Sequence, residues 1–259
     1  MKTMLVTNDD GFESVGLKAL VDTLREVARV IVVAPTTEKS ACSHSLTLTR
    51  PLRFVKLDDD FYKLDDGTPT DCVYLAINAL FEEGKPDLVV SGINKGANMG
   101  EDITYSGTAA GAMEGAIHDI PSVAISQVCN GRCQGIELFD FALAKESIKK
   151  IVQDILDGKL QIPHRRFLNV NIPHIEKEKS KGFKITNAGY RLYGNDAHVH
   201  RNPRGDEYHW IGLHPLAWGK NREGMSDFKA VSEGYVSITP VKLDLTSYED
   251  IKELQSWIG

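Results

Sequence analysis

Two adjacent aspartates, Asp9 and Asp10, are the residues in this sequence best suited to chemistry, and Gly11 follows them directly. Neighbouring side chains on a strand point to opposite faces, so these carboxylates can converge only where the chain leaves extended geometry, which Gly11 would ease. Two crowded carboxylates then need a cation to offset their repulsion. Out of context, Asp-Asp-Gly is also an ordinary turn sequence, and that alternative stays open.

Neutral oxygen donors follow two other short apolar runs, and we add Ser40 and Asn94 to the acidic pair. Carboxylate, hydroxyl and amide oxygens suit a hard ion such as Mg²⁺ or Mn²⁺, whereas zinc prefers His and Cys. The predicted metal ligands are therefore Asp9, Asp10, Ser40 and Asn94.

A second candidate feature is the run of hydroxyl and small residues over 104–113, which leads into a predicted helix. The N-terminus of a helix offers free N–H groups and the positive end of the helix dipole, which suit a phosphate. Ser106, Gly107 and Thr108 are the predicted phosphate-binding residues, and Gly107 would allow close approach of the backbone. The plainer alternative is that Ser106 or Thr108 only caps the helix, and the two roles are compatible.

The polar loop immediately before this helix favours a functional site, because a bare helix cap needs none of its side chains. Asn94 and Asn98 are predicted to contact phosphate, and Asp102 to orient or deprotonate a water molecule. A solvated loop carboxylate is the open alternative for Asp102.

The elements that must position these residues alternate short apolar runs with amphipathic stretches, as expected of βαβ units in an α/β protein with a mainly parallel sheet covered by helices. In such sheets ligands bind at the carboxyl ends of the strands, where the candidate residues lie. The predicted strands span 4–7, 30–34, 88–91 and 122–125, and the predicted helices span 15–27, 70–81, 109–118 and 138–156.

From about residue 182 the sequence becomes aromatic and polar without helical periodicity. We therefore divide the chain into a core, 1–181, and a C-terminal extension, 182–259. Within the extension, 235–241 is predicted to be a strand, and Thr246 or Ser247 can cap a final helix that runs to Trp257. The extension is expected to pack on the core or on another subunit.

Composition excludes several classes of protein. Of the 259 residues, 42% are hydrophobic and 25% are charged, and no apolar run approaches the length needed to span a bilayer. The N-terminus lacks the apolar core of a signal peptide, so we expect a cytoplasmic protein. A net charge of -6 argues against stable binding of nucleic acid. The four cysteines lack zinc-site spacing and are expected to be free thiols, with a bridge between Cys129 and Cys133 as the alternative.

Five sequence strings stand out along nearly the whole chain: Thr7-Asn8-Asp9-Asp10-Gly11, Gly67-Thr68-Pro69-Thr70-Asp71-Cys72-Val73, Ser91-Gly92-Ile93-Asn94-Lys95-Gly96-Ala97-Asn98, Tyr105-Ser106-Gly107-Thr108 and Glu233-Gly234-Tyr235-Val236-Ser237-Ile238-Thr239-Pro240. Together these strings resemble the SurE family of survival-protein nucleotidases. Any one string could occur by chance, but all five in the family's order are not expected by chance.

The resemblance implies a three-layer α/β/α Rossmann-like core and an extension, with a hairpin and a terminal helix, that swaps between subunits of a homodimer or homotetramer. It also implies hydrolysis of nucleoside 5'-monophosphates to nucleoside and phosphate, with one Mg²⁺ or Mn²⁺ per subunit. Some members also cleave 3'-nucleotides or short polyphosphate. The family's metal ligands match Asp9, Asp10, Ser40 and Asn94. One departure is Ala41, where many relatives have Gly; if that position needs positive φ, the Ser40 hydroxyl would shift.

The mechanism that these residues favour is direct in-line attack of a water molecule, activated by the metal, on the phosphorus. Asp9, Asp10 and Asp102 are its predicted catalytic residues. His44 has a slight advantage as the group that protonates the leaving oxygen, whereas His198 and His200 fit surface positions better.

Rival mechanisms lack their signatures in this chain. Neither Cys42 nor Cys129 has the spacing from Arg that a cysteine phosphatase needs, and adjacent Asp9 and Asp10 do not fit an aspartyl-phosphate enzyme. The G-x-G-x-x-G fingerprint of a dinucleotide-binding fold is also missing. The open alternatives are a sensor that binds metal and nucleotide without turnover and, for the substrate's base, stacking on Tyr190, Tyr193 or Trp210.

Overall fold

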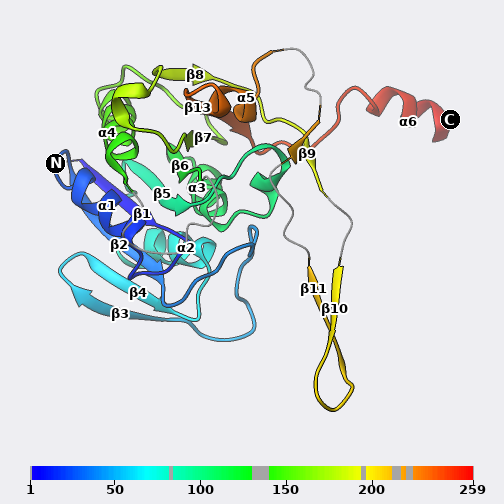
Figure 1. The fold of residues 1–259 in the computed structure, drawn as a ribbon. Helices are drawn as coiled ribbons and strands as arrows, with labels where there is room; N and C mark the ends of the chain where they lie inside the picture. The colour runs from blue at the N-terminus through cyan, green and yellow to red at the C-terminus, as the bar shows by residue number, and fades with distance from the viewer. Residues whose placement is uncertain are drawn as a thin grey trace.

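A nine-stranded sheet forms the centre of the computed structural model, in the order β3-β4-β2-β1-β5-β6-β7-β13-β8 (Figure 1). The structure describes residues 2–81, 84–129, 140–193, 197–211, 217–219 and 224–258. The strands of this sheet are β1 (Thr3–Thr7), β2 (Arg29–Pro35), β3 (Arg53–Asp58), β4 (Phe61–Asp65), β5 (Leu88–Lys95), β6 (Ser122–Gln127), β7 (Arg166–Ile172), β8 (Phe183–Ile185) and β13 (Val236–Lys242).

The order of the strands creates a switch point between β1 and β5. Neighbours from β4 through β2, β1, β5 and β6 to β7 are all parallel, while β3 and β13 run antiparallel to β4 and β7. The chain adds β2 and then β4 on one side of β1 and returns to place β5 on the other side. Ligands bind at such reversals in α/β sheets, so this edge is where the candidate residues should meet.

Helices cover both faces of the sheet and give the predicted three layers. They are α1 (Val15–Leu24), α2 (Pro69–Ala79), α3 (Gly107–Ile117) and α4 (Ala142–Leu156). On β1, Met4 and Val6 pack with α1 and α4, whereas Leu5 packs with α2. This alternation follows from the two-residue period of a strand.

The start of α2 shows how local sequence sets an element's boundary. The Thr68 hydroxyl accepts from the Asp71 N–H at 3.1 Å, and the Asp71 carboxylate accepts from the Thr68 N–H at 2.9 Å. Pro69 occupies the first helical turn. These contacts form a reciprocal capping box, so the predicted helix start is confirmed.

The composition of α3 brings it unusually close to the sheet. A Cβ on Gly111 would lie 2.8 Å from Thr7 Cγ2 and 2.9 Å from Ser91 Oγ, and these two residues are paired on β1 and β5. Glycine therefore lets the helix rest directly on the two strands beside the switch point.

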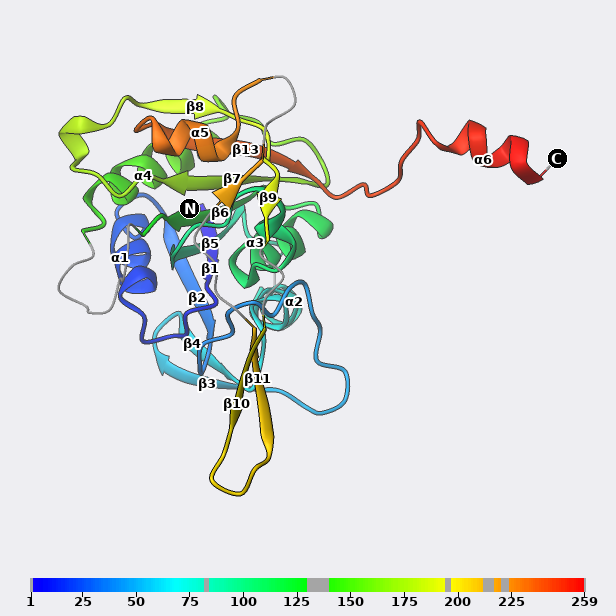
Figure 2. The same cartoon turned by 45° about the vertical axis from the view of Figure 1, so that its right-hand side comes forward.

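The extension contributes both to the sheet and to outlying elements. β8 and β13 join the main sheet, and the predicted hairpin and terminal helix are confirmed as β10 with β11 and as α6. In Figure 2 the hairpin and α6 project away from the core. The remaining elements are η1 (Gly100–Thr104), η3 (Lys177–Lys179), β9 (Arg191–Leu192), β10 (Ala197–Arg201), β11 (Glu207–Ile211), β12 (Ala217–Trp218), α5 (Asp227–Ser232) and α6 (Ile251–Ile258).

Two sequence expectations need amendment. The strands β3, β4, β7 and β8 were not predicted, and α5 forms in the extension where no helical periodicity was seen. The first residues of the helix expected over 138–156 lie outside the described residues. Cys42 and Cys72 are free, but Cys129 is disulfide-bonded, which corrects the expectation of free thiols throughout; Cys133 lies outside the described residues. None of the described helices is long and apolar enough to cross a membrane.

Candidate active site

A tight turn after β1 carries the acidic pair at the switch point. The Asn8 amide Nδ2 donates to the Gly11 carbonyl at 3.0 Å and to the Ser14 hydroxyl at 2.8 Å. Gly11 has a φ of 93°, a left-handed conformation that glycine adopts at little cost. The chain thus leaves extended geometry directly after Asp9 and Asp10, as predicted.

Asp9 is the buried member of the pair, with 4% of its surface exposed. The Thr108 hydroxyl donates a hydrogen bond to Asp9 Oδ1, and the Lys39 N–H donates to the Asp9 carbonyl at 2.7 Å. Burial raises the pKa of the Asp9 carboxyl, while the hydrogen bond from Thr108 opposes that rise. The end of β1, the loop after β2 and the N-terminus of α3 therefore meet at Asp9.

Asp10 lies beside it in a less buried position, where Oδ2 accepts from the Lys95 N–H at 3.3 Å. Burial, followed by the nearby Asp9 charge, raises the pKa of Asp10 to about 6. Both causes disfavour the ionised carboxylate, and a bound cation would reverse both. The site is thus electrostatically suited to a divalent metal.

The donor chemistry around the pair fits a hard cation. Asn94 lies on β5, and its Nδ2 donates to the Gly96 carbonyl at 3.1 Å, which leaves Oδ1 as the acceptor on the other arm of the amide. Asn8 Oδ1, one residue before Asp9, is buried and has no hydrogen-bond partner within the described part of the chain, as expected beside a polar ligand. Among the residues that the structure describes, no three His, Cys, Asp or Glu side chains gather into a group that could hold a metal ion.

Ser40, the fourth predicted ligand, lies on the loop after β2 and is exposed. Its hydroxyl donates to Glu38 Oε1 at 2.7 Å. The Glu38 charge contributes to raising the pKa values of both Asp9 and Asp10, so a third carboxylate lies close to the site. Sequence reasoning missed Glu38, which lies between the end of β2 and Ser40, because only neutral donors were sought after that strand and Glu38 is in none of the five strings.

Ala41, the one departure from the family pattern, follows Ser40 and has an unusual backbone conformation. Ala41 has a φ of 56°, so this position does adopt the left-handed conformation that glycine favours. For an alanine this conformation costs about 1 kcal/mol. The strain lies directly beside the Ser40 hydroxyl.

We expect Ala41→Gly to relieve this strain and to stabilise the fold by up to about 1 kcal/mol, partly offset by the greater freedom of glycine in the unfolded chain. Urea unfolding measures the change. Ala79→Gly at the end of α2 is the matched control and should lose stability, because glycine disfavours a helix. A loss of stability in Ala41→Gly comparable to that of the control would show that the loop is not strained.

The hydroxyl and small residues predicted to bind phosphate, which we call the phosphate cradle, lie at the N-terminus of α3. The Ser106 hydroxyl accepts from the Ala109 N–H at 3.0 Å, so Ser106 does cap the helix. Gly107 leaves no room for a side chain, because a Cβ there would lie 2.9 Å from Cys42 Sγ and 3.0 Å from Asp9 Oδ2. The first N–H groups of the helix thus open directly beside the carboxylates.

Asn98 and Asp102, the other predicted site residues, are engaged with protein partners. The Asn98 amide donates to Ser126 Oγ at 2.8 Å, and its backbone N–H donates to Asn171 Oδ1 at 2.9 Å. Asp102 accepts from Arg191 Nε at 3.1 Å through Oδ2 and from the Tyr193 hydroxyl at 2.9 Å through Oδ1. Both residues hold the loop around the site, and neither partner set could be read from the local sequence.

His44, the candidate for leaving-group protonation, is held away from the start of α3. Its Nε2 lies 2.7 Å from Glu114 Oε2, and Glu114 also contacts His118. Glu114 is eight residues beyond Ser106, or about 12 Å along the helix axis. The geometry therefore gives His44 a role in fastening its loop to α3.

Aromatic residues of the extension divide into two groups. Tyr193 packs edge-on against Tyr105 with ring centroids 6.3 Å apart, close to η1 and the cradle. Trp210 lies on the projecting hairpin opposite His198, and it is 66% exposed. Of the aromatic residues proposed to stack on a base, Tyr193 therefore packs against Tyr105 beside the start of α3, Tyr190 lines a hollow with Gly100 and Glu101 of η1, and Trp210 lies on the hairpin.

Cys42 also lies beside the cradle, next to Gly107. Burial, followed by the Asp9 charge, raises the pKa of its thiol to about 11. At neutral pH the thiol is protonated and is a poor nucleophile, which agrees with the exclusion of a cysteine phosphatase.

Comparison with known proteins decides the family. The family profile described as Survival protein SurE matches residues 4–195. The chain belongs to the SurE family. It is 61% identical over 260 residues to the 5'-nucleotidase SurE of Nitratiruptor, covering 100% of both chains, and 65% identical over 260 residues to that of Wolinella succinogenes, also over 100% of both.

A solved SurE structure shares the fold. The crystal structure of the SurE protein from Aquifex aeolicus matches with a TM-score of 0.83 and 43% sequence identity, over 99% of this chain and 100% of that one. The predicted family and the α/β fold are therefore confirmed. The switch-point site therefore lies in a chain that matches SurE proteins along its full length.

Proposed function

We propose that this SurE chain hydrolyses nucleoside 5'-monophosphates to nucleoside and phosphate, with a divalent metal ion held by Asp9 and Asp10. The observation that carries the proposal is the contact between Thr108, at the start of α3, and the buried Asp9 carboxylate. This contact supports the proposal, because it joins a residue proposed to bind phosphate to a residue proposed to bind the metal. The names of the similar 5'-nucleotidases support the same reaction.

Asp9 and Asp10 would hold the metal, with the Asn94 amide and the Ser40 hydroxyl as further donors. Once bound, a divalent cation lowers the pKa of a water molecule and offsets charge on the phosphoryl oxygens. Mg²⁺ and Mn²⁺ are the ions that this donor set favours, at one ion per subunit.

The chain's own contribution is to orient the phosphate. Gly107 and Thr108, in the first turn of α3, would bind the non-bridging oxygens, as the N-termini of helices bind phosphate. Thr108 also keeps Asp9 in place through its hydroxyl. We assign Asp102 and Asn98 to positioning, because their polar atoms bind Arg191, Tyr193, Ser126 and Asn171.

Phosphate release from AMP or GMP with Mn²⁺ or Mg²⁺, followed by addition of EDTA, tests this proposal. We expect turnover that EDTA abolishes and that renewed metal restores. Parallel assays with 3'-AMP and tripolyphosphate would define the range of substrates. Turnover that continues in EDTA would contradict the metal site, and metal-dependent nucleotide binding without phosphate release would favour the sensor alternative.

We also propose that α6 and the β10–β11 hairpin make subunit contacts in a homodimer or homotetramer, with exchange of these two projecting elements of the extension. Both project from the core in Figure 2, and α6 carries exposed apolar side chains, with Leu254 60%, Trp257 81% and Ile258 73% exposed. An isolated helix of this length gains too little from its own hydrogen bonds to persist without packing. Light scattering should give a mass of at least two chains, and removal of 244–259 should lower it; an unchanged mass would refute the role of α6.

A further inference from the structure

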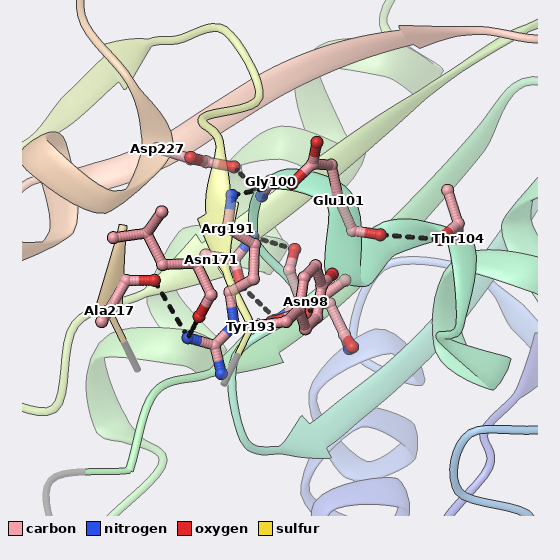
Figure 3. A network of polar contacts seen from close by, with 11 residues as sticks. Asn98, Gly100, Glu101, Thr104, Asn171, Arg191, Tyr193, Ala217 and Asp227 are labelled. Atoms are coloured by element: carbon pink, nitrogen blue, oxygen red, sulfur yellow. Dashed lines mark hydrogen bonds and ion pairs between the residues drawn. The ribbon is translucent and has the colours of Figure 1, made fainter. Parts of the chain in front are cut away.

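Asp227, at the start of α5 in the extension, reaches the loop that leads into the phosphate cradle. It is fully buried, and its carboxylate accepts backbone N–H groups from Gly100 at 2.7 Å, Gly189 at 3.0 Å and Phe228 at 2.9 Å. Gly100 lies 127 residues away in sequence and begins η1. One carboxylate thus joins the core loop, the extension and α5 (Figure 3).

The junction around Asp227 leaves no space for adjustment. A Cβ on Gly100 would lie 2.3 Å from the Gly189 carbonyl oxygen, and a Cβ on Gly189 would lie 2.6 Å from the Phe228 ring. Three backbone segments therefore meet at van der Waals contact around the carboxylate. Close packing of this kind transmits a displacement of one segment to the others.

A second contact joins the same two regions two residues further along. Arg191, with 9% of its side chain exposed, donates through Nε to Asp102, and its backbone N–H donates to Glu101 Oε2 at 2.8 Å. The Tyr193 hydroxyl donates to the other Asp102 oxygen. Figure 3 shows these side chains converging on η1 from the extension. We call Asp227, Arg191 and Tyr193 the clasp.

The segment that the clasp holds continues directly into the cradle. The Ser106 N–H donates to the Asp102 carbonyl at 3.2 Å, and Ser106 is the cap of α3. On the other side, Asn98 is fixed to β7 by the Asn169 amide at 2.7 Å. The segment from Asn98 to Asp102 is thus held at both ends. β7 holds it at Asn98, and the clasp holds it at Asp102.

From these contacts we propose that Asp227 and Arg191 are positioning residues of the phosphate cradle. They hold η1 so that the first N–H groups of α3 face the phosphate, although neither is placed to touch substrate. The inference rests on the proposed function, because it concerns how phosphate is held. It assigns to the extension a role within its own subunit's site.

The central test is Asp227→Asn, which keeps the shape of the side chain but sets an amide NH₂ against backbone N–H donors. We expect kcat/KM for AMP with Mn²⁺ to fall about tenfold or more, and inhibition by inorganic phosphate to weaken by a similar factor. Mn²⁺ affinity, measured by calorimetry, should stay within about twofold, because the clasp contains none of the proposed ligands.

Asp87→Asn is the matched control. Asp87 also binds a backbone N–H, that of Thr3 at 2.8 Å, but at the amino end of the sheet. It should reproduce any general loss of stability while leaving phosphate inhibition unchanged. A folded Asp227→Asn protein with wild-type phosphate inhibition would overturn the inference.

If Asp227→Asn does not fold, Arg191→Met decides the question, because it removes the ion pair with Asp102 and the hydrogen bond to the Ala217 carbonyl and keeps the apolar stem. It should weaken phosphate inhibition about threefold to fivefold, and Arg191→Lys should restore part of the effect. Unchanged inhibition in Arg191→Met would refute the clasp. If the wild-type protein shows neither turnover nor phosphate inhibition, the proposed function itself fails, and the two failures are thereby separated.

Discussion

Asp10→Asn should lower turnover of AMP by more than about a hundredfold, since loss of an outer-shell partner alone can cost that much and Asp10 is a proposed ligand. The same substitution should stabilise the metal-free fold at pH 7.5. Removing one carboxylate relieves both its burial and its repulsion by Asp9, the two causes that raise the pKa of Asp10 to about 6. Loss of turnover together with a more stable metal-free fold is the result expected when a metal-binding carboxylate is removed.

The pH dependence of stability follows from the same shift. The Asp10 pKa is about 6 in the folded chain and 3.8 by its ordinary value, so the folded state holds the proton more tightly. The resulting stabilisation is fully present below pH 3.8 and is lost as the pH rises through about 6. After allowance for solvent screening, the loss is about 1 to 2 kcal/mol.

Thermal unfolding in EDTA at pH 5 and pH 7.5 measures this effect. The wild-type protein should lose stability over this interval relative to Asp10→Asn, and Mn²⁺ should restore it only in the wild type. Asp87→Asn should keep the wild-type pH dependence over this interval: burial tends to raise the pKa of Asp87, but hydrogen bonds from Lys2 and Thr3 outweigh it and lower that pKa, so Asp87 is ionised in both the folded and the unfolded chain above pH 5. A wild-type protein whose stability does not respond to Mn²⁺ would rule out the site at Asp10.

The parts of the fold that sequence predicted are those where apolar side chains alone decide. The buried runs of β1, β2, β5 and β6 were recognisable because both of their faces are covered. β7 was not, because Asn169 and Asn171 interrupt its apolar run. Both asparagines are fully buried, and their amides donate to the Asn98 carbonyl, a partner that only the folded chain reveals.

The candidate site likewise contains residues that the local sequence reveals and residues whose partners appear only in the folded chain. Asp9, Asp10 and Asn94 were identified because they follow strands at the switch point, which is a rule of topology. Asp102 was predicted to orient or deprotonate water, with a solvated loop carboxylate as the alternative, because nothing near it in sequence points to Arg191, 89 residues away. Glu38 was overlooked for a related reason: only its distance from the acidic pair in the folded chain gives it importance.

Gly107→Ala should damage catalysis although alanine is the better helix former. The new Cβ would lie 2.8 Å from Asp9 Cβ and 2.9 Å from Cys42 Sγ, closer than packed carbon atoms tolerate. Because Asp9 is buried and held by Thr108, it must shift or the first turn of α3 must move outward. Either displacement separates the metal site from the phosphate cradle, and we expect kcat/KM for AMP to fall about a hundredfold.

Two further variants test whether the close contacts of the new Cβ cause the loss of activity in Gly107→Ala. Gly219→Ala is the control, because a Cβ there would only make ordinary contacts with Leu192 and Tyr190 at 3.7 Å and 3.8 Å, and its activity should stay near the wild-type value. Adding Cys42→Ala to Gly107→Ala removes one of the two close contacts and should restore part of the activity. Full activity in Gly107→Ala alone would mean that the start of α3 and the acidic pair need not be in contact, and the phosphate would then have to bind elsewhere.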